Sequence, residues 1–136
     1  NIVAAKEANG DISALAQTVK LCGDELTIYS GNDDQITAFM SLGAKGVISV
    51  LSNIAPRAVH DMVKMYLDGD TAASTELQLK YLDLCSSLFS DVNPIPVKEA
   101  MNMMGMEVGS CRLPLTQIQP QAKEKLKKSL SALGMI

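Results

Sequence analysis

Short apolar runs alternate with amphipathic segments through the first half of the chain. Three runs are rich in strand-forming residues: NIVAA at 1–5, LTIY at 26–29 and GVISV at 46–50. Apolar residues at helical spacing predict a helix after each run, over 12–22, 34–42 and 56–67. Apolar strands that alternate with helices across short loops are typical of a parallel sheet, so the pattern predicts an α/β fold.

Local signals mark the ends of these helices. Asp11 is a suitable N-cap for the first helix, and Gly23 is placed to end it. Gly43 is the C-cap candidate of the second helix, and Pro56 stands where the first turn of a helix tolerates proline. The boundaries therefore follow from residue types as well as from periodicity.

The second half of the chain predicts helices only. Apolar side chains recur at helical spacing over 71–89, and two further helices are expected, one over 97–104 and one that begins at Pro120. The RLPL segment at 112–115 lies between them and is expected to be extended.

We therefore divide the chain into three strand–helix units, residues 1–69, and a C-terminal helical region, residues 70–136. Three parallel strands cannot close a barrel, and they leave apolar sheet edges at 2–5 and 46–50. Proteins usually protect such edges with charge or cover them. The pattern therefore indicates that further strands belong on at least one side of the sheet.

Composition narrows the class of protein. The chain has 136 residues, of which 47% are hydrophobic, and its net charge is −3. No apolar run approaches the roughly 20 residues of a membrane helix, and no basic block suggests nucleic acid as a partner. Three widely spaced cysteines favour reduced thiols in a cytoplasmic protein, and a single histidine excludes a multi-histidine zinc site within the chain. The chain opens directly into a strand-like run without an initiator Met, as expected of a chain entered in the middle.

Lys6 is the residue most able to carry chemistry. It shares one strand face with Ile2 and Ala4, at the carboxyl end of the strand, where α/β proteins build their sites. Among apolar neighbours an ammonium loses hydration, which favours the neutral amine that attacks a carbonyl to form an imine. From local sequence alone, a lysine that extends from the strand end into water is the simpler interpretation.

Other polar residues fall near the same end of the sheet. Gly31 follows the second strand and permits close approach of the backbone to a ligand, although a simple turn also explains it. Ile48 lies near the end of the third strand. Glu7 points to the face opposite Lys6 and is interpreted as a partner of the following loop, and His60 as a histidine on a helix surface.

At Lys6 the sequence resembles a known family. The matching segments are AKEANGD at 5–11, SGND at 30–33, GAKGVISV at 43–50, NPIPVK at 93–98 and RLPL at 112–115. In this order they are similar to the dihydrodipicolinate synthase / N-acetylneuraminate lyase family over essentially the whole chain, with Lys6 in its Schiff-base motif. The last two segments resemble the synthase branch more than the sialic-acid lyase branch.

The resemblance implies a (β/α)8 TIM barrel followed by a C-terminal helical region. Lys6 would end the sixth strand, so the chain would hold strands six to eight and the tail. A complete barrel takes about 250 residues, so about half would lie outside this sequence. The proton-relay tyrosine and the carboxylate-binding threonine pair of the family belong to that other half, and we expect no significant turnover from this chain without it.

The resemblance also implies the reaction. Lys6 would form an imine with pyruvate, and the derived enamine would attack aspartate semialdehyde to give 4-hydroxy-tetrahydrodipicolinate for diaminopimelate and lysine biosynthesis. Gly31 and Ile48 match positions that line the pyruvate pocket. No metal or organic cofactor is implied, and members are commonly homotetramers.

Two alternatives remain open. One is a related aldolase that combines pyruvate with another aldehyde, such as a sialic-acid or keto-sugar-acid lyase. The other is a non-catalytic half-barrel that self-associates to cover its strand edges. Departures from the family at Ala5, Asn9 and Asn32 affect packing and loop hydrogen bonding, and none of them removes the nucleophile.

Overall fold

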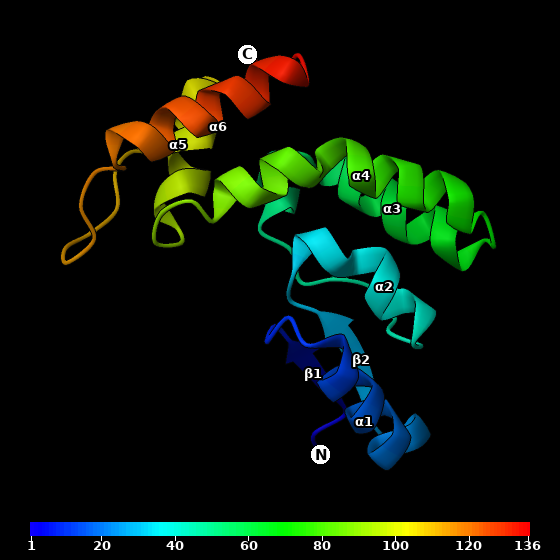
Figure 1. Cartoon of the computed structure of the whole chain (residues 1–136). Helices are drawn as coiled ribbons and strands as arrows, with labels where there is room; N and C mark the ends of the chain where they lie inside the picture. Colours follow the sequence, from blue (N-terminus) through cyan, green and yellow to red (C-terminus); the bar gives the residue numbers. More distant parts are fainter. The chain divides into compact units, whose positions relative to one another are not determined.

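The computed structural model describes residues 1–136 and is mixed α/β, with two parallel strands and mostly helical secondary structure (Figure 1). The strands are β1 (Ala4–Glu7) and β2 (Thr27–Ser30), and the helices are α1 (Ile12–Cys22), α2 (Ile36–Ser41), α3 (Pro56–Leu67), α4 (Thr71–Leu88), α5 (Ile95–Met103) and α6 (Pro120–Ala132). No helix is both long enough and apolar enough to cross a membrane.

The chain forms two compact units. Unit 1 comprises Asn1–Ser49 and Arg57–Leu79, and unit 2 comprises Val50–Pro56 and Lys80–Ile136. All three residues predicted to form the site, Lys6, Gly31 and Ile48, belong to unit 1.

The parallel pairing of the first two strands is as predicted. β1 and β2 are parallel and in register, with Lys6 opposite Tyr29. β1 begins later than the expected 1–5 and includes Lys6 and Glu7, so Lys6 lies within the strand. β1 pairs with β2 alone, so its other edge is open as predicted, and Ile2 and Val3 just before β1 are 81% and 72% exposed.

The third predicted strand, 46–50, is wrong as a regular strand. It is reduced to an isolated parallel bridge between Ser30 and Val47, although Lys45 N–H still donates to Ile28 O at 2.9 Å. Gly46 has φ +150°, a conformation that favours glycine and interrupts regular strand geometry. The segment therefore runs beside β2 without forming a full ladder.

Two helices cover one face of the strand pair. Leu15 of α1 and Phe39 of α2 pack with Ile28 of β2 and Ala44, and Ala5 lies against this cluster. Since successive strand residues point to opposite faces, Lys6 is on the other face. The helices α1 and α2, which form this cluster, do not cover that face.

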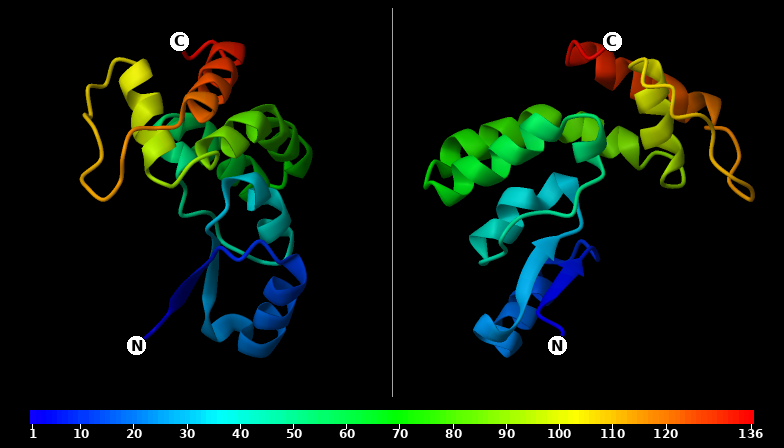
Figure 2. Two further views of the ribbon diagram at one scale, coloured as in Figure 1. Left: turned by 60° about the vertical axis from the view of Figure 1, so that its left-hand side comes forward. Right: turned by 180° about the vertical axis from the view of Figure 1, so that it is seen from behind.

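The ends of α1 and α3 confirm the boundary predictions. Asp11 caps α1 by accepting hydrogen bonds from Ser13 N at 2.8 Å and Ala14 N at 3.1 Å, and Gly23 follows its last turn with φ +54°. Pro56 is the first residue of α3. In unit 1, α3 runs beside the start of α4, where Ser74 Oγ donates to Met62 O at 2.7 Å (Figure 2).

Unit 2 is built on the later helices. Leu84 and Leu88 of α4 and Leu126 and Leu130 of α6 are buried. The helix predicted over 97–104 begins at Ile95 because a proline is tolerated in a first turn, where its missing N–H has no helical partner to lose.

The extended conformation expected for 112–115 is wrong. The segment folds into a turn closed by a 3.1 Å hydrogen bond from Leu115 N to Arg112 O. Apolar residues beside a proline suit both an extended segment and a turn, so residue types did not separate the two.

Candidate active site

Lys6 extends from the third residue of β1 on the face opposite α1 and α2. Its side chain is exposed, so the expectation that apolar neighbours surround the amine is wrong for this chain. The reason is that the face carrying Ala4 and Lys6 has no covering layer within unit 1. The amine is therefore accessible to a small molecule or to a further part of a protein.

Gly31 lies directly against Lys6. Its N–H donates to Glu7 O at 2.7 Å, and the residue is buried. A Cβ on Gly31 would lie 2.9 Å from Lys6 Cε and 2.5 Å from Ala8 Cβ, closer than side-chain carbons approach. Ala8 therefore leaves no room for a side chain at this position, and the end of the Lys6 side chain lies beside the glycine.

The turn around Gly31 is fixed by Ser30. The Ser30 hydroxyl donates to Asn32 O at 2.9 Å and accepts from Asn32 N at 3.1 Å, and the side chain is fully buried. This local closure of a turn by a hydroxyl was not predicted. The signal available for it was a serine immediately before a glycine at a strand end.

Ile48 joins the same cluster through its backbone. Its N–H donates to Ser30 O at 2.8 Å, and its side chain is 47% exposed. The structure therefore brings the three predicted residues to neighbouring segments, with Lys6 against Gly31 and Ile48 hydrogen-bonded to the residue before Gly31.

The loop after Lys6 is held by its own polar side chains. Glu7 Oε1 accepts from Asn9 N at 2.9 Å, which confirms Glu7 as a partner of the loop. Asn9 Oδ1 in turn accepts from Asp11 N at 2.7 Å. These short-range bonds lead the chain from β1 into α1.

A buried amide from α4 reaches the segment after Gly31. Gln78 is 7% exposed; its Oε1 accepts from Thr37 N and its Nε2 donates to Asp34 O, both at 2.7 Å. Sequence reasoning missed it. The signal was a glutamine one turn after Ser74 on the buried face of α4, where an apolar residue would be expected.

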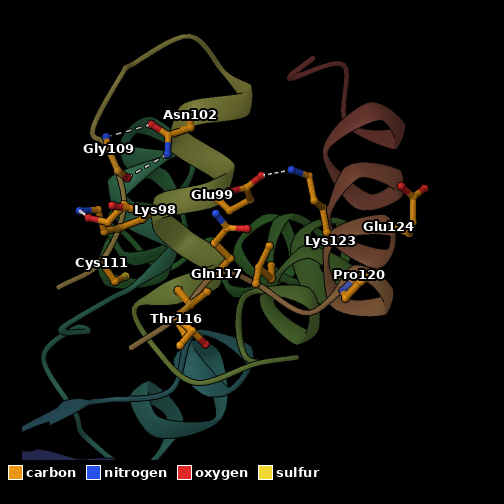
Figure 3. Close-up of a pocket in the computed structure, with 13 residues that line it drawn as sticks. Lys98, Glu99, Asn102, Gly109, Cys111, Thr116, Gln117, Pro120, Lys123 and Glu124 are labelled. Carbon is orange, nitrogen blue, oxygen red and sulfur yellow. Dashed lines mark hydrogen bonds and ion pairs between the residues drawn. The ribbon is translucent and has the colours of Figure 1, made fainter. Parts of the chain in front are cut away.

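A cavity of about 500 Å³ lies within unit 2, between α5, the start of α6 and the loop that joins them (Figure 3). Four of its charged and amide side chains are paired: those of Lys98, Glu99, Asn102 and Lys123. Lys123 Nζ is 2.6 Å from Glu99 Oε1, and both ends of the Asn102 amide bond Gly109. Lys6, Gly31 and Ile48 do not line it, so it is separate from the candidate site.

His60 has a surface role, as predicted. It is exposed on α3, and its Nδ1 lies 2.8 Å from Asp61 Oδ1. No group of three or more His, Cys, Asp or Glu side chains in the structure is arranged to hold a metal ion.

Comparison with known proteins places this geometry in a family. Residues 1–133 match the Dihydrodipicolinate synthetase family. The chain belongs to this family. Among curated relatives in the dihydrodipicolinate synthetase family, the 4-hydroxy-tetrahydrodipicolinate synthase of Lachnoclostridium phytofermentans is 52% identical over all 136 residues. The alignment covers 46% of that relative, so the chain spans about half the length of the curated proteins it matches.

Solved structures of the same family have the same fold over this region. The dihydrodipicolinate synthase from Aquifex aeolicus matches with a TM-score of 0.94 and 39% identity, over 99% of this chain and 46% of its own. A chloride-inhibited dihydrodipicolinate synthase from Acinetobacter baumannii, complexed with pyruvate, matches with a TM-score of 0.94 and 37% identity over 100% of this chain and 47% of its own. The chain thus matches about half the length of each of these dihydrodipicolinate synthase TIM-barrel chains.

Proposed function

We propose that this chain is the lysine-bearing half of a 4-hydroxy-tetrahydrodipicolinate synthase. The observation that carries the proposal is the position of Lys6, an exposed primary amine in β1 whose Cε lies beside Gly31, 2.9 Å from where a Cβ on that glycine would be. Similarity to a curated synthase over the whole chain supports the same assignment, as does the pyruvate complex of the Acinetobacter baumannii neighbour.

In this proposal the chain supplies strands six to eight of a (β/α)8 barrel in residues 1–69, and residues 70–136 form the helical tail. The edge of β1 that faces away from β2 is open, and Ile2 and Val3 just before the strand are exposed. A preceding strand would pair at this edge. A covering half would also shield the face of the sheet that carries Lys6. The apolar surroundings that the sequence predicts for the amine would then exist only in the assembled protein.

The proposed chemistry starts at Lys6 Nζ. The neutral amine attacks the keto carbon of pyruvate, and loss of water gives an imine. Loss of a methyl proton converts the imine into an enamine, whose carbon attacks the aldehyde of aspartate semialdehyde. Ring closure by the amino group of the semialdehyde onto the imine carbon releases Lys6 and gives 4-hydroxy-tetrahydrodipicolinate.

The residues of this chain would position the ketoacid rather than transfer its protons. Gly31 limits where the Lys6 stem can lie, and the segment of Ile48 is hydrogen-bonded to Ser30 beside it. The proton relay and the carboxylate-binding groups would come from the other half. We therefore expect no normal turnover from the 136-residue chain alone, and an assembled homotetramer as the active form.

Imine trapping tests the proposal. The chain is combined with the part of the Lachnoclostridium phytofermentans relative that it does not cover, and the assembly is treated with pyruvate and borohydride. Peptide mass analysis should find the reduced pyruvate adduct on Lys6, and Lys6→Arg should abolish it. An assembly that turns over substrate but carries no adduct on Lys6 would refute the assignment.

The choice of aldehyde is tested separately. A related pyruvate-dependent aldolase would form the same adduct but use a sugar aldehyde in place of aspartate semialdehyde. The similarity to curated 4-hydroxy-tetrahydrodipicolinate synthases favours the semialdehyde. A self-associating half-barrel without catalysis would form no adduct at all.

A further inference from the structure

Helix α2 begins without a cap of its own. Gln35 occupies its N-cap position and makes no side-chain capping hydrogen bond. The first N–H groups of a helix have no partner within it, so a group outside the helix must satisfy them. Thr37 N–H, in the first turn of α2, is satisfied by Gln78 Oε1 at 2.7 Å.

The same amide holds the turn that precedes α2. Gln78 Nε2 donates to Asp34 O at 2.7 Å, so one buried side chain binds the 3₁₀ turn Asp33–Gln35 and α2 at once. Gln78 lies 41 and 44 residues after its two partners and is 7% exposed. A buried amide with both ends bonded defines one arrangement of the groups it joins, because any other leaves a polar atom unsatisfied.

Asp34, which Gln78 binds, lies three residues after Gly31, the glycine beside Lys6. Between Gly31 and Asp34 the chain is further fixed by the Ser30 hydroxyl on Asn32. Gly31 N–H bonds to Glu7 O on the β1 side. The loop carrying Gly31 is therefore fastened to β1 at one end and to α4 at the other.

We propose that Gln78 is a positioning residue for imine formation at Lys6. By fixing the start of α2, it keeps Gly31 against the Lys6 stem and so limits the orientations available to the amine. This inference rests on the proposed role of Lys6 and assigns part of the helical region to the support of the site.

The test compares two buried residues one turn apart on α4. Gln78→Met keeps the side-chain length and removes both hydrogen bonds to the loop. Ser74→Ala is the matched control, because Ser74 is fully buried and bonds Met62 O of α3 without contacting the loop. Both variants are measured in the assembly of this chain with the complementary part of the relative, by borohydride trapping over a range of pyruvate concentrations and by urea unfolding.

We expect both variants to unfold at lower urea, and only Gln78→Met to require more pyruvate for half-maximal trapping, by about tenfold. Gln78→Glu keeps an acceptor for Thr37 N–H but sets a carboxylate oxygen against Asp34 O, so its requirement should rise at least as far as that of Gln78→Met. Gln78→Leu adds no charge and removes both hydrogen bonds, so it should behave like Gln78→Met and replaces it if the Met variant does not fold.

Two results would overturn the inference, and they differ from each other. If the unsubstituted assembly forms an adduct and the Gln78 variants behave like Ser74→Ala, Gln78 is only structural and the proposed function stands. If the unsubstituted assembly forms no adduct on Lys6, the proposed function fails and the inference falls with it.

Discussion

At Gly31, the space for a side chain is already taken by the stem of Lys6 and by Ala8. The packing places the smallest residue where the loop after β2 meets the end of β1. The site depends on the absence of a side chain at Gly31 as much as on the amine of Lys6. Its sensitivity to substitution can be tested directly.

Gly31→Ala should destabilise the chain by about 1–3 kcal/mol, because its Cβ would lie 2.5 Å from Ala8 Cβ and 2.9 Å from Lys6 Cε. It should also slow borohydride trapping of pyruvate in the assembled protein. Adding Ala8→Gly removes the closer contact, so the double variant should regain stability while trapping stays slow. Trapping at the unsubstituted rate in Gly31→Ala would show that the contact with Lys6 has no effect on the amine.

The side-chain hydrogen bonds predicted from the sequence all have near partners, and none with a distant partner was predicted. Glu7 and Asp11 bond groups two or three positions away, so residue type and spacing were sufficient. Gln78 bonds groups more than 40 positions away, and no local pattern specifies which loop a buried glutamine will reach. The exposure of Lys6 agrees with the simpler local interpretation, a lysine that extends into water, whereas the apolar surroundings expected for an imine-forming amine are not found, since they depend on what covers the sheet.

Among the elements, α1 has the most completely specified ends. Its N-cap carboxylate satisfies two N–H groups of the first turn, and a glycine with positive φ follows its last turn. Helices of this kind owe part of their stability to one side chain.

Asp11→Ala should therefore lower the free energy of unfolding by about 1 kcal/mol. Asp11→Asn keeps an acceptor for Ser13 N–H and should lose much less. Urea unfolding followed by circular dichroism measures both. Equal losses from the two variants would assign the effect to the charge instead of the capping bond.

The turn between α4 and α5 is tied to the start of α6 by Asp91. Its carboxylate accepts from Gln119 N at 2.9 Å and from Val92 N at 2.7 Å. These two backbone hydrogen bonds, that from Gln119 first, hold the pKa of Asp91 below its ordinary value of 3.8.

A carboxyl whose pKa is lowered on folding stabilises the fold above its ordinary pKa, and this contribution is lost as the pH falls through the lowered value. Asp91→Asn should therefore destabilise the chain at neutral pH and have little effect well below pH 3.8. Urea midpoints across this range measure the difference. A deficit that is the same at both ends of the range would contradict the role given to the charge.

The segment 46–50, predicted as a third strand, shows what local sequence could not predict. An apolar GVISV run was sufficient to place a chain segment beside β2, and the backbone hydrogen bonds of Lys45 and Ile48 to β2 are present. It was not sufficient to predict regular pairing, because that depends on a neighbour on the far side and on the backbone angle of Gly46. The order of the elements could be predicted from the sequence, but whether this segment pairs regularly with β2 could not.

At the scale of the whole molecule, unit 1 has an open strand edge at β1, whose only strand neighbour is β2. The carbonyls of Val3 and Glu7 accept hydrogen bonds from the β2 side, so by alternation those of Ala4 and Lys6 face the open edge. An unpaired edge beside exposed Ile2 and Val3 favours pairing with another chain.

We expect the isolated chain to associate as its concentration rises. Replacing Ile2 and Val3 with lysine should suppress this, because charge on an edge opposes strand pairing. Leu21→Lys is the control, since Leu21 is 84% exposed but lies on α1. Sedimentation velocity over a concentration series gives the result, and equal suppression by the control would point to general surface hydrophobicity.

The bonds of Gln78 bear on how this protein can be dissected. A piece that stopped at residue 69 would retain Lys6, Gly31 and Ile48, yet the start of α2 would lose the amide that closes it. The minimal unit for reconstitution studies therefore runs into α4, and a piece that keeps the three candidate residues but ends before Gln78 should bind less firmly to its complementary half.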